Sequence, residues 1–225
     1  MTVPVLTIDG PGGAGKGTIA SLIAVRRGWH LLDSGALYRL TALAVEKAGI
    51  DVRDGEAVAA VAAALDVHFG AQGDLPAGVW LCGERVTRDI RQETIGTAAS
   101  IVAGIPSVRS ALLKRQRDFA TAPGLVADGR DMGTTVFPEA LLKIYMTASV
   151  NERAQRRLKQ LRKAGISASL EGLLEDIQAR DERDEQRRVS PLRPADDAIV
   201  LDTTELDIPD VVARIDALLD ERLKV

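Results

Sequence analysis

Cysteine, aromatic residues and net charge are all scarce in this chain of 225 residues. The single cysteine, Cys82, excludes an intrachain disulfide and a metal site built from several cysteines, and it favours a reducing cytoplasm. The formal net charge of -3 argues against a protein that coats nucleic acid or an anionic membrane. Aromatic residues make up only 3% of the chain, which is too few for a platform on which bases would stack.

Long apolar runs are absent as well. No run approaches the ~18 residues of a membrane span, and glycines follow the first apolar residues too early for a signal peptide. We therefore expect a cytoplasmic protein with no membrane or nucleic-acid partner. A hydrophobic share of 46% is enough to give residues 1–225 a sizeable core, and we predict a single domain.

A glycine-rich segment follows the first apolar run, residues 5–8. It has the sequence Gly10-Pro11-Gly12-Gly13-Ala14-Gly15-Lys16-Gly17-Thr18. Glycines allow successive backbone N–H groups to point at one anion, and the next helix adds its positive N-terminal end. Lys16 supplies a charge for the β- and γ-phosphates, and the Thr18 hydroxyl can serve Mg²⁺. The segment therefore predicts a loop that wraps the phosphates of a nucleoside triphosphate; the alternative is a turn that merely joins a strand to a helix.

The hydroxyl in this loop comes one residue later than in the general P-loop pattern, because Gly17 follows the lysine. The resulting GKGT ending is typical of nucleoside-monophosphate kinases. This departure from the general pattern therefore narrows the class of enzyme.

Five apolar runs separated by helical periodicity predict an α/β fold with a parallel sheet. The predicted strands are residues 5–8, 30–32, 125–127, 142–146 and 198–201. The predicted helices are residues 16–26, 36–48, 56–65, 92–103, 107–120, 151–163, 170–187 and 209–223. Helix N-caps are predicted at Ser107, Asn151 and Ser169. Residues 66–91 instead contain short β-like pieces with a turn at Gly83-Glu84, which predicts a small antiparallel insert packed around Trp80 and Phe69.

Polar residues follow the first three predicted strands, at the sheet edge where ligands bind in open α/β proteins. Asp128 ends the third strand and could hold Mg²⁺ directly or through water; the alternative is a carboxylate that caps its loop. Arg39 and Arg130 follow the second and third strands and could bind the phosphate of an acceptor through paired hydrogen bonds. Taken singly, they would be solvated surface arginines.

Two basic helices follow in the second half of the chain. Residues 153–163 are rich in arginine and lysine, which predicts a lid that stabilises charge during phosphoryl transfer; the alternative is a nucleic-acid patch. In the next helix Arg180, Arg183, Asp184 and Arg187 share one face. We expect Asp184 to accept hydrogen bonds from ribose hydroxyls, and the alternative is a solvated, salt-bridged helix.

Four separated motifs resemble those of the bacterial cytidylate kinases, from the first strand to the last helix. They are GPGGAGKGT at 10–18, HLLDSGALYR at 30–39, ADGRDMGT at 127–134 and ARDERDEQRR at 179–188. The resemblance implies a monomeric kinase that transfers the γ-phosphate of ATP to CMP or dCMP with Mg²⁺. It also implies a five-stranded parallel sheet flanked by helices, with an acceptor-binding region at 34–107, which includes the β insert at 66–91, and a lid at 151–167.

The resemblance assigns roles to individual residues. On the donor side, residues 10–18 hold the ATP phosphates, Thr18 and Asp128 serve Mg²⁺, Arg153 lies against adenine, and residues 202–204 flank that base. The residues implied in acceptor binding are Ser34, Tyr38 and Arg39 lining the pocket, Arg39 and Arg130 on the CMP phosphate, Ser100, Arg109, Asp131 and Arg187 at the cytosine edge, and Arg180 with Asp184 at the sugar. Those expected to act on the transferring or acceptor phosphate, and hence to be catalytic, are Lys16, Arg39, Arg130 and Arg157.

Two departures from the family pattern are mild. Gly12 replaces a serine or alanine that is common at this position of the family, and the turn at 71–78 differs from the family pattern.

Three other functions are considered: a P-loop kinase for UMP, AMP or shikimate, a GTP-hydrolysing switch, and an ATP-binding nucleic-acid module. The combination of Arg109, Asp131 and Asp184 favours a pyrimidine nucleotide over the first, and the missing Asn-Lys-x-Asp motif argues against the second.

Overall fold

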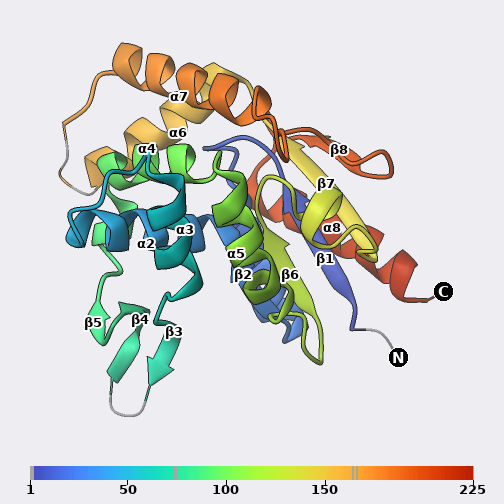
Figure 1. Ribbon diagram of the computed structural model, residues 1–225. Coiled ribbons are helices and arrows are strands. Elements are labelled where there is room, and N and C mark those ends of the chain that lie inside the picture. The colour runs from blue at the N-terminus through green and yellow to red at the C-terminus, as the bar shows by residue number, and fades with distance from the viewer. Residues whose placement is uncertain (1–2, 73–74, 164, 166, 225) are drawn as a thin grey trace. The chain divides into compact units, whose positions relative to one another are not determined.

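The computed structural model describes residues 3–72, 75–163, 165 and 167–224. The chain divides into two compact units. Figure 1 labels the helices and strands along the chain. The first unit comprises residues 1–33 and 116–225, and the second comprises residues 34–115. Residues 73–74 of the expected insert and residues 164 and 166 of the expected lid lie outside the described residues.

The first unit is built on a five-stranded parallel sheet with strand order β2-β6-β1-β7-β8. The strands are β1 (Val5–Asp9), β2 (His30–Asp33), β6 (Leu125–Asp128), β7 (Leu142–Thr147) and β8 (Ile199–Asp202). All five predicted strands are confirmed, and their ends differ from the prediction by one residue. The central strand β1 is buried along its whole length, as expected for a parallel strand covered on both faces.

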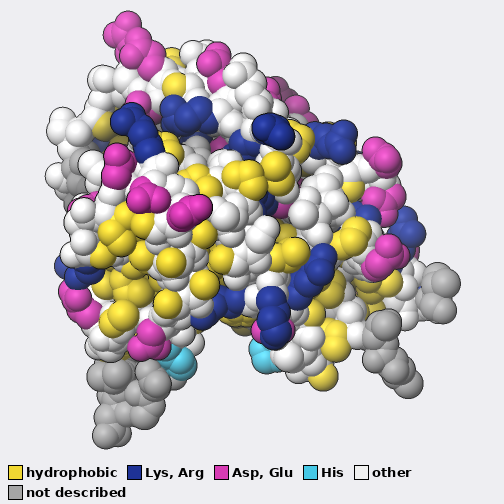
Figure 2. Space-filling model, in the orientation of Figure 1, with side chains coloured by type: hydrophobic (Ala, Val, Ile, Leu, Met, Phe, Trp, Pro, Cys, Tyr) yellow, Lys and Arg dark blue, Asp and Glu magenta, His cyan; other side chains and the backbone are white. Residues whose placement is uncertain are grey.

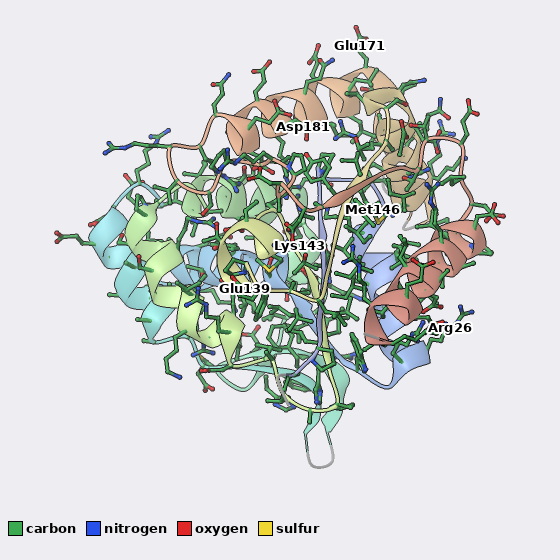
Figure 3. All side chains as sticks on the ribbon, turned by 90° about the vertical axis from the view of Figure 1, so that its right-hand side faces the viewer. Arg26, Glu139, Lys143, Met146, Glu171 and Asp181 are labelled. Carbon is green, nitrogen blue, oxygen red and sulfur yellow. The ribbon has the colours of Figure 1, made fainter. Side chains whose placement is uncertain are left out.

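Helices α1 (Lys16–Arg27) and α8 (Ile208–Leu223) pack on the sheet and share a hydrophobic core with it. Gly15 and Gly28 bracket α1 in left-handed conformations, with φ of 92° and 64°, so both helix ends use the residue type that tolerates positive φ. Arg26 lies beside α8 in Figure 3, and its Nη1 is 2.5 Å from Asp216 Oδ2. Asp216 also accepts from Arg27 Nε at 2.9 Å, which ties the two helices together.

Helices α6 (Val150–Lys163) and α7 (Leu170–Glu185) pack against each other through Ala154, Leu161 and Leu173. The predicted N-cap Ser169 is confirmed, because it accepts from Gly172 N at 3.1 Å. The predicted N-cap Asn151 is wrong: α6 begins at Val150, and Ser149 accepts from Glu152 N at 3.2 Å. A short π-helix, η2 (Met132–Val136), follows β6 and was not predicted.

The second unit contains α2 (Ser34–Lys47), α3 (Gly55–Ala63), the short helix η1 (Asp89–Arg91), α4 (Glu93–Val102) and most of α5 (Pro106–Arg117). Its antiparallel sheet, β3 (Val67–Gln72), β4 (Leu75–Leu81) and β5 (Glu84–Arg85), confirms the predicted insert. The β4–β5 turn lies at Cys82-Gly83, one residue earlier than predicted, with φ of 49° and 77°. Ser107 is not an N-cap, because it lies inside α5 and its hydroxyl donates to Gly55 O at 3.1 Å.

Among the described residues, no single helix is long and apolar enough to cross a membrane. One bent pair, α4 with α5, reaches the required length and composition only when the two helices are taken together across a 100° bend.

Candidate active site

The carboxyl ends of three strands in the first unit lie side by side. Asp128 at the end of β6 is in register with Ile8 of β1 on one side and with Asp33 of β2 on the other. The phosphate loop and residues 128–131 therefore leave the same edge of the sheet, as predicted for a ligand site in this class of fold.

The phosphate loop between β1 and α1 depends on its glycines at defined points. Gly13 and Gly15 have φ of 81° and 92°. At Gly10, with φ of 142°, an added Cβ would lie 1.9 Å from the carbonyl oxygen of Met146, so no side chain fits. These left-handed residues turn the backbone so that its amides can face an anion, in front of the positive end of α1.

Lys16 is buried at the first position of α1, and its ammonium donates to Pro11 O of the same loop at 2.8 Å. Burial lowers its pKa to about 7, and the positive charges of Arg130 and Arg180 act in the same direction, while Asp128 and Asp9 oppose them. The loop therefore concentrates positive charge in a buried place, which phosphate groups would compensate.

Oxygen donors suitable for Mg²⁺ flank Gly17. Thr18 is exposed in the first turn of α1, and Asp128 Oδ2 would lie only 3.3 Å from a Cβ added at Gly17. One carboxylate and one hydroxyl fit an ion that takes most of its ligands from phosphates and water. The described part of the chain holds no group of three or more His, Cys, Asp or Glu side chains arranged as a metal cage.

Arg130 and Arg187 meet on the carboxylate of Asp184, which is 1% exposed. Arg130 Nε donates to Asp184 Oδ2 at 3.0 Å, and Arg187 donates to the other oxygen. Burial opposes the ionisation of Asp184, but the two guanidinium groups, with Arg180, hold its pKa below the ordinary value. This carboxylate is therefore ionised near neutral pH. Of the four residues predicted to share a face of α7, Arg180 and Asp184 lie in the helix and interact. Arg187 reaches Asp184 from just beyond the end of α7, and Arg183 is exposed.

Arg130 and Arg180 also reach the phosphate loop. An added Cβ at Gly12 would lie 3.5 Å from a terminal nitrogen of Arg130 and 3.6 Å from one of Arg180. The structure thus brings two of the expected acceptor-binding arginines, Arg130 and Arg180, close to the expected donor loop within the first unit.

Arg153 lies inside a network of hydrogen bonds. Its three nitrogens donate to Ala148 O at 3.0 Å, to Gly12 O of the phosphate loop at 3.1 Å and to Asp181 Oδ2 at 2.6 Å. Figure 3 places Asp181 on the inner side of α7, whereas Glu171 points outward from the same helix. Arg153 therefore links α6, α7 and the loop; the expected adenine contact stays a prediction.

Arg156 also connects α6 to the phosphate loop. It donates to Ala14 O at 3.3 Å and to Thr203 O, in the loop after β8, at 2.7 Å. Arg157, on the same helix, is half-buried and donates to Gln160 Oε1 at 3.2 Å. In Figure 2, basic side chains in the region of α6 and α7 are interspersed with acidic ones, unlike a uniformly basic nucleic-acid surface.

Asp131, which directly follows Arg130 in the first unit, is also buried. The other predicted acceptor residues belong to the second unit. Ser34 and Tyr38 are buried in α2, Ser100 is buried in α4, and Arg109 lies over the Tyr38 ring with 5.5 Å between the guanidinium carbon and the ring centroid. Arg39 Nη1 donates to Ile90 O at 2.7 Å. Its guanidinium also lies 2.9–3.3 Å from a Cβ added at Gly96, so glycine in α4 makes room for it.

Two residues beside the phosphate loop received no individual role from the sequence, although Arg156 belongs to the basic run predicted to form the lid. Asp9, which ends β1, accepts from Met132 N and Gly133 N, and Arg156 joins the loops around α6. Asp9 does follow an apolar strand as a single carboxylate, which is a usable signal. Arg156 carries no such signal, because it stands among several other basic residues.

Comparison with known proteins gives one consistent result. Residues 6–221 match the family model described as cytidylate kinase. The chain is 53% identical over 221 residues to a cytidylate kinase of Photobacterium profundum, covering 98% of this chain and 96% of the relative. It is 58% identical over 214 residues to one of Stutzerimonas stutzeri, covering 95% and 93%.

A solved gluconokinase from Sinorhizobium meliloti 1021 is a more distant likeness, with 15% identity, a TM-score of 0.48 and coverage of 97% and 92%. The matches to the family model and to the two cytidylate kinases span almost the whole chain, and they include the phosphate loop and both basic helices. On this evidence, the chain belongs to the cytidylate kinase family.

Proposed function

We propose that this chain transfers the γ-phosphate of ATP to CMP or dCMP, giving ADP with CDP or dCDP. The observation that carries the proposal is the family match over residues 6–221, since relatives named cytidylate kinase share 53% and 58% of aligned residues with the chain. In the transfer, an oxygen of the CMP phosphate bonds to the γ-phosphorus as the bond to the bridging oxygen of ADP breaks. The attacking phosphate is already anionic near neutral pH, so no general base is needed.

The donor is held by the phosphate loop and the residues around it. Loop amides and Lys16 bind the β- and γ-phosphates, and the buried positive charge of this region compensates the charge of the triphosphate. Arg153 keeps the Gly12 carbonyl and the loop in place, while Arg156 and Arg157 supply further cations near the donor. Thr18 and Asp128 would hold Mg²⁺, which neutralises phosphate charge when it is bound.

The acceptor residues divide between the units. In the first unit, Arg130 binds the CMP phosphate, Asp131 and Arg187 read the cytosine edge, and Arg180 with Asp184 binds the sugar. In the second unit, we assign Arg39 to phosphate binding, and Ser34, Tyr38, Ser100 and Arg109 to contacts with the acceptor nucleotide. We propose residues 34–107 as the acceptor-binding region and residues 151–167 as the lid.

In this scheme Arg130 exchanges its hydrogen bond to Asp184 for hydrogen bonds to the acceptor phosphate. In the structure its guanidinium binds Asp184 through Nε, and one of its terminal nitrogens lies near Gly12. A phosphate offers it paired hydrogen bonds, and Asp184 then keeps Arg187 and gains sugar hydroxyls as donors. Charge compensation and positioning carry the rate.

A panel of phosphate acceptors tests this function. With ATP and Mg²⁺, CMP and dCMP should be phosphorylated far faster than UMP, AMP or shikimate. Equal rates on CMP, UMP and AMP would contradict the cytosine assignment, and GTP hydrolysis without an acceptor would favour a switch. Arg130→Ala should lose about 10³-fold in turnover while it remains folded, because a cation on the transferring charge is removed.

Two properties stay predictions. A monomer is expected, and sedimentation velocity of the purified protein would measure it. A cytoplasmic location is expected, and cell fractionation with an antibody against the chain would test it.

A further inference from the structure

Asp9 is a buried carboxylate to which the proposed transfer gives no role. It ends β1, directly before the phosphate loop, and is 5% exposed. Its Oδ1 accepts from Met132 N at 2.9 Å and its Oδ2 from Gly133 N at 2.8 Å. Both oxygens thus bind the first two amides of the π-helix η2.

The origin of this cap is unusual for a helix. A helix N-terminus is ordinarily capped by the side chain of its own N-cap residue. Here the N-cap is Asp131, whose side chain makes no capping hydrogen bond, and Asp9 caps η2 from a position more than 120 residues earlier in the chain. The cap therefore ties η2 to β1, and the Asp131 carboxylate is not used at the helix end.

A second bond attaches the same segment to β1. Gly129 N donates to Ile8 O at 3.1 Å, so that the stretch from Gly129 to Gly133 is held at both ends by two consecutive residues of β1. Between the two attachments lie only Arg130 and Asp131. Their backbone positions relative to the phosphate loop are therefore set by the end of β1.

The contact between η2 and β1 is also tight. An added Cβ at Gly133 would lie 2.9 Å from Thr7 Oγ1 and 3.1 Å from Lys143 Cδ, so only glycine allows this approach. Burial raises the pKa of Asp9 to about 7, although the Met132 and Gly133 amides act against this increase. A neutral apolar side chain would avoid the free-energy cost of burying a carboxylate, but it could not accept hydrogen bonds from the two amides.

We propose that Asp9 is a positioning residue for recognition of the acceptor nucleotide. By capping η2 from β1, it fixes the backbone positions from which Arg130 reaches the acceptor phosphate and Asp131 reaches the base. The same residue leads into Gly10, so the donor loop and the acceptor-reading segment share one anchor. The proposal rests on the cytidylate kinase activity proposed above and deepens it.

Asp9→Asn tests the proposal with almost no change in volume. The amide oxygen of asparagine can accept from one backbone N–H, but its NH₂ group then faces the other, which loses its acceptor. We expect KM for CMP to rise about tenfold and the CMP/UMP ratio of kcat/KM to fall by a similar factor, because one buried amide is left unsatisfied. KM for ATP should change much less.

The matched control is Asp216→Asn. Asp216 is a second buried carboxylate of the first unit, and it binds Arg26 and Arg27 between α1 and α8. Its replacement should lower the melting temperature without a change in the CMP/UMP ratio. If Asp9→Asn behaves in the same way, Asp9 is merely structural and the proposal is overturned.

A second variant and a measurement without substrate complete the test. Gly133→Ala should move η2 off β1 without touching the carboxylate, and it should reproduce the loss of CMP selectivity. In the ligand-free protein, hydrogen exchange at the Met132 and Gly133 amides should accelerate in Asp9→Asn but not in Asp216→Asn. Unchanged exchange overturns the anchor, whereas a wild-type chain inactive on CMP overturns the proposed activity instead.

Discussion

Gly17 and Asp128 make a close approach that explains the departure of the phosphate loop from the general P-loop pattern. Asp128 Oδ2 would lie 3.3 Å from a Cβ at position 17, tighter than an ordinary contact. A residue with a side chain at this position, such as the serine or threonine of the general pattern, would press on the carboxylate. Glycine after the lysine therefore leaves room for an acidic group beside the first turn of α1.

We predict that Gly17→Ala separates metal dependence from stability. The methyl group must move the Asp128 carboxylate by a few tenths of an ångström, so the Mg²⁺ concentration that gives half-maximal activity should rise by about tenfold. Stability should be kept or raised by about 0.5–1 kcal/mol, because alanine is the better helix residue. Mg²⁺ titration of activity and urea unfolding measure the two quantities. An unchanged Mg²⁺ midpoint would show that Asp128 does not serve the ion.

Gly12→Ala should stabilise the protein. The nearest atom to an added Cβ at Gly12 is 3.5 Å away, which is ordinary contact, and the residue is not in the left-handed region. Alanine restricts the unfolded chain and should therefore raise the free energy of unfolding by about 0.4–1 kcal/mol.

Gly13→Ala is the matched control for this prediction. Gly13 has φ of 81°, and its added Cβ would lie 3.2 Å from Arg153 Cβ. The same substitution one residue later should therefore destabilise the protein by about 1–2 kcal/mol. Urea unfolding of both variants compares them; a loss of stability in Gly12→Ala would contradict the assigned geometry.

The sheet and the strand-end residues were predictable because they follow from local patterns. Short apolar runs with glycine-rich or acidic ends mark β1, β2 and β6, and the rule for parallel sheets then brings Asp33, Asp128 and the phosphate loop to one edge. The β insert was predictable for the same reason, because its short pieces break the helical period.

The contacts that hold the site together were not predictable. Asp9 acts on Met132 and Gly133 across more than 120 residues, and nothing near Asp9 in the sequence indicates a π-helix elsewhere. The predicted N-caps failed at Asn151 and Ser107 for a related reason: the helices begin one residue earlier, and tertiary packing decides such boundaries. Sequence periodicity locates a helix but does not say which arginine on it turns inward.

Arg153 and Asp181 offer a test that separates folding from donor binding. Arg153→Met leaves Asp181 without its cation and should cost about 3–5 kcal/mol of stability. Adding Asp181→Leu should restore most of it, since a buried ion pair can be replaced by apolar residues at little cost. KM for ATP should stay raised in both variants, because both lack the bond to Gly12 O. If KM for ATP recovers together with stability, that bond has no role of its own in donor binding.

Lys16 leads to a prediction about proton uptake. Its pKa in the ligand-free protein is lowered to about 7, so at pH 8 most of the population is neutral. ATP phosphates favour the charged form and raise this pKa, so that binding at pH 8 should take up about one proton per site, against none well below pH 7. Affinity for ATP should therefore fall as the pH rises above 7.

Calorimetry in two buffers of different ionisation enthalpy measures this uptake directly. Asp9, whose pKa is also about 7, lies close enough to sense the same phosphates and would contribute an uptake of the same sign. Repeating the measurement with Asp9→Asn removes that contribution and leaves the part due to Lys16. Zero uptake at pH 8 in this variant would mean that Lys16 is already charged in the free protein, with Pro11 O and the nearby carboxylates sufficient to keep its proton.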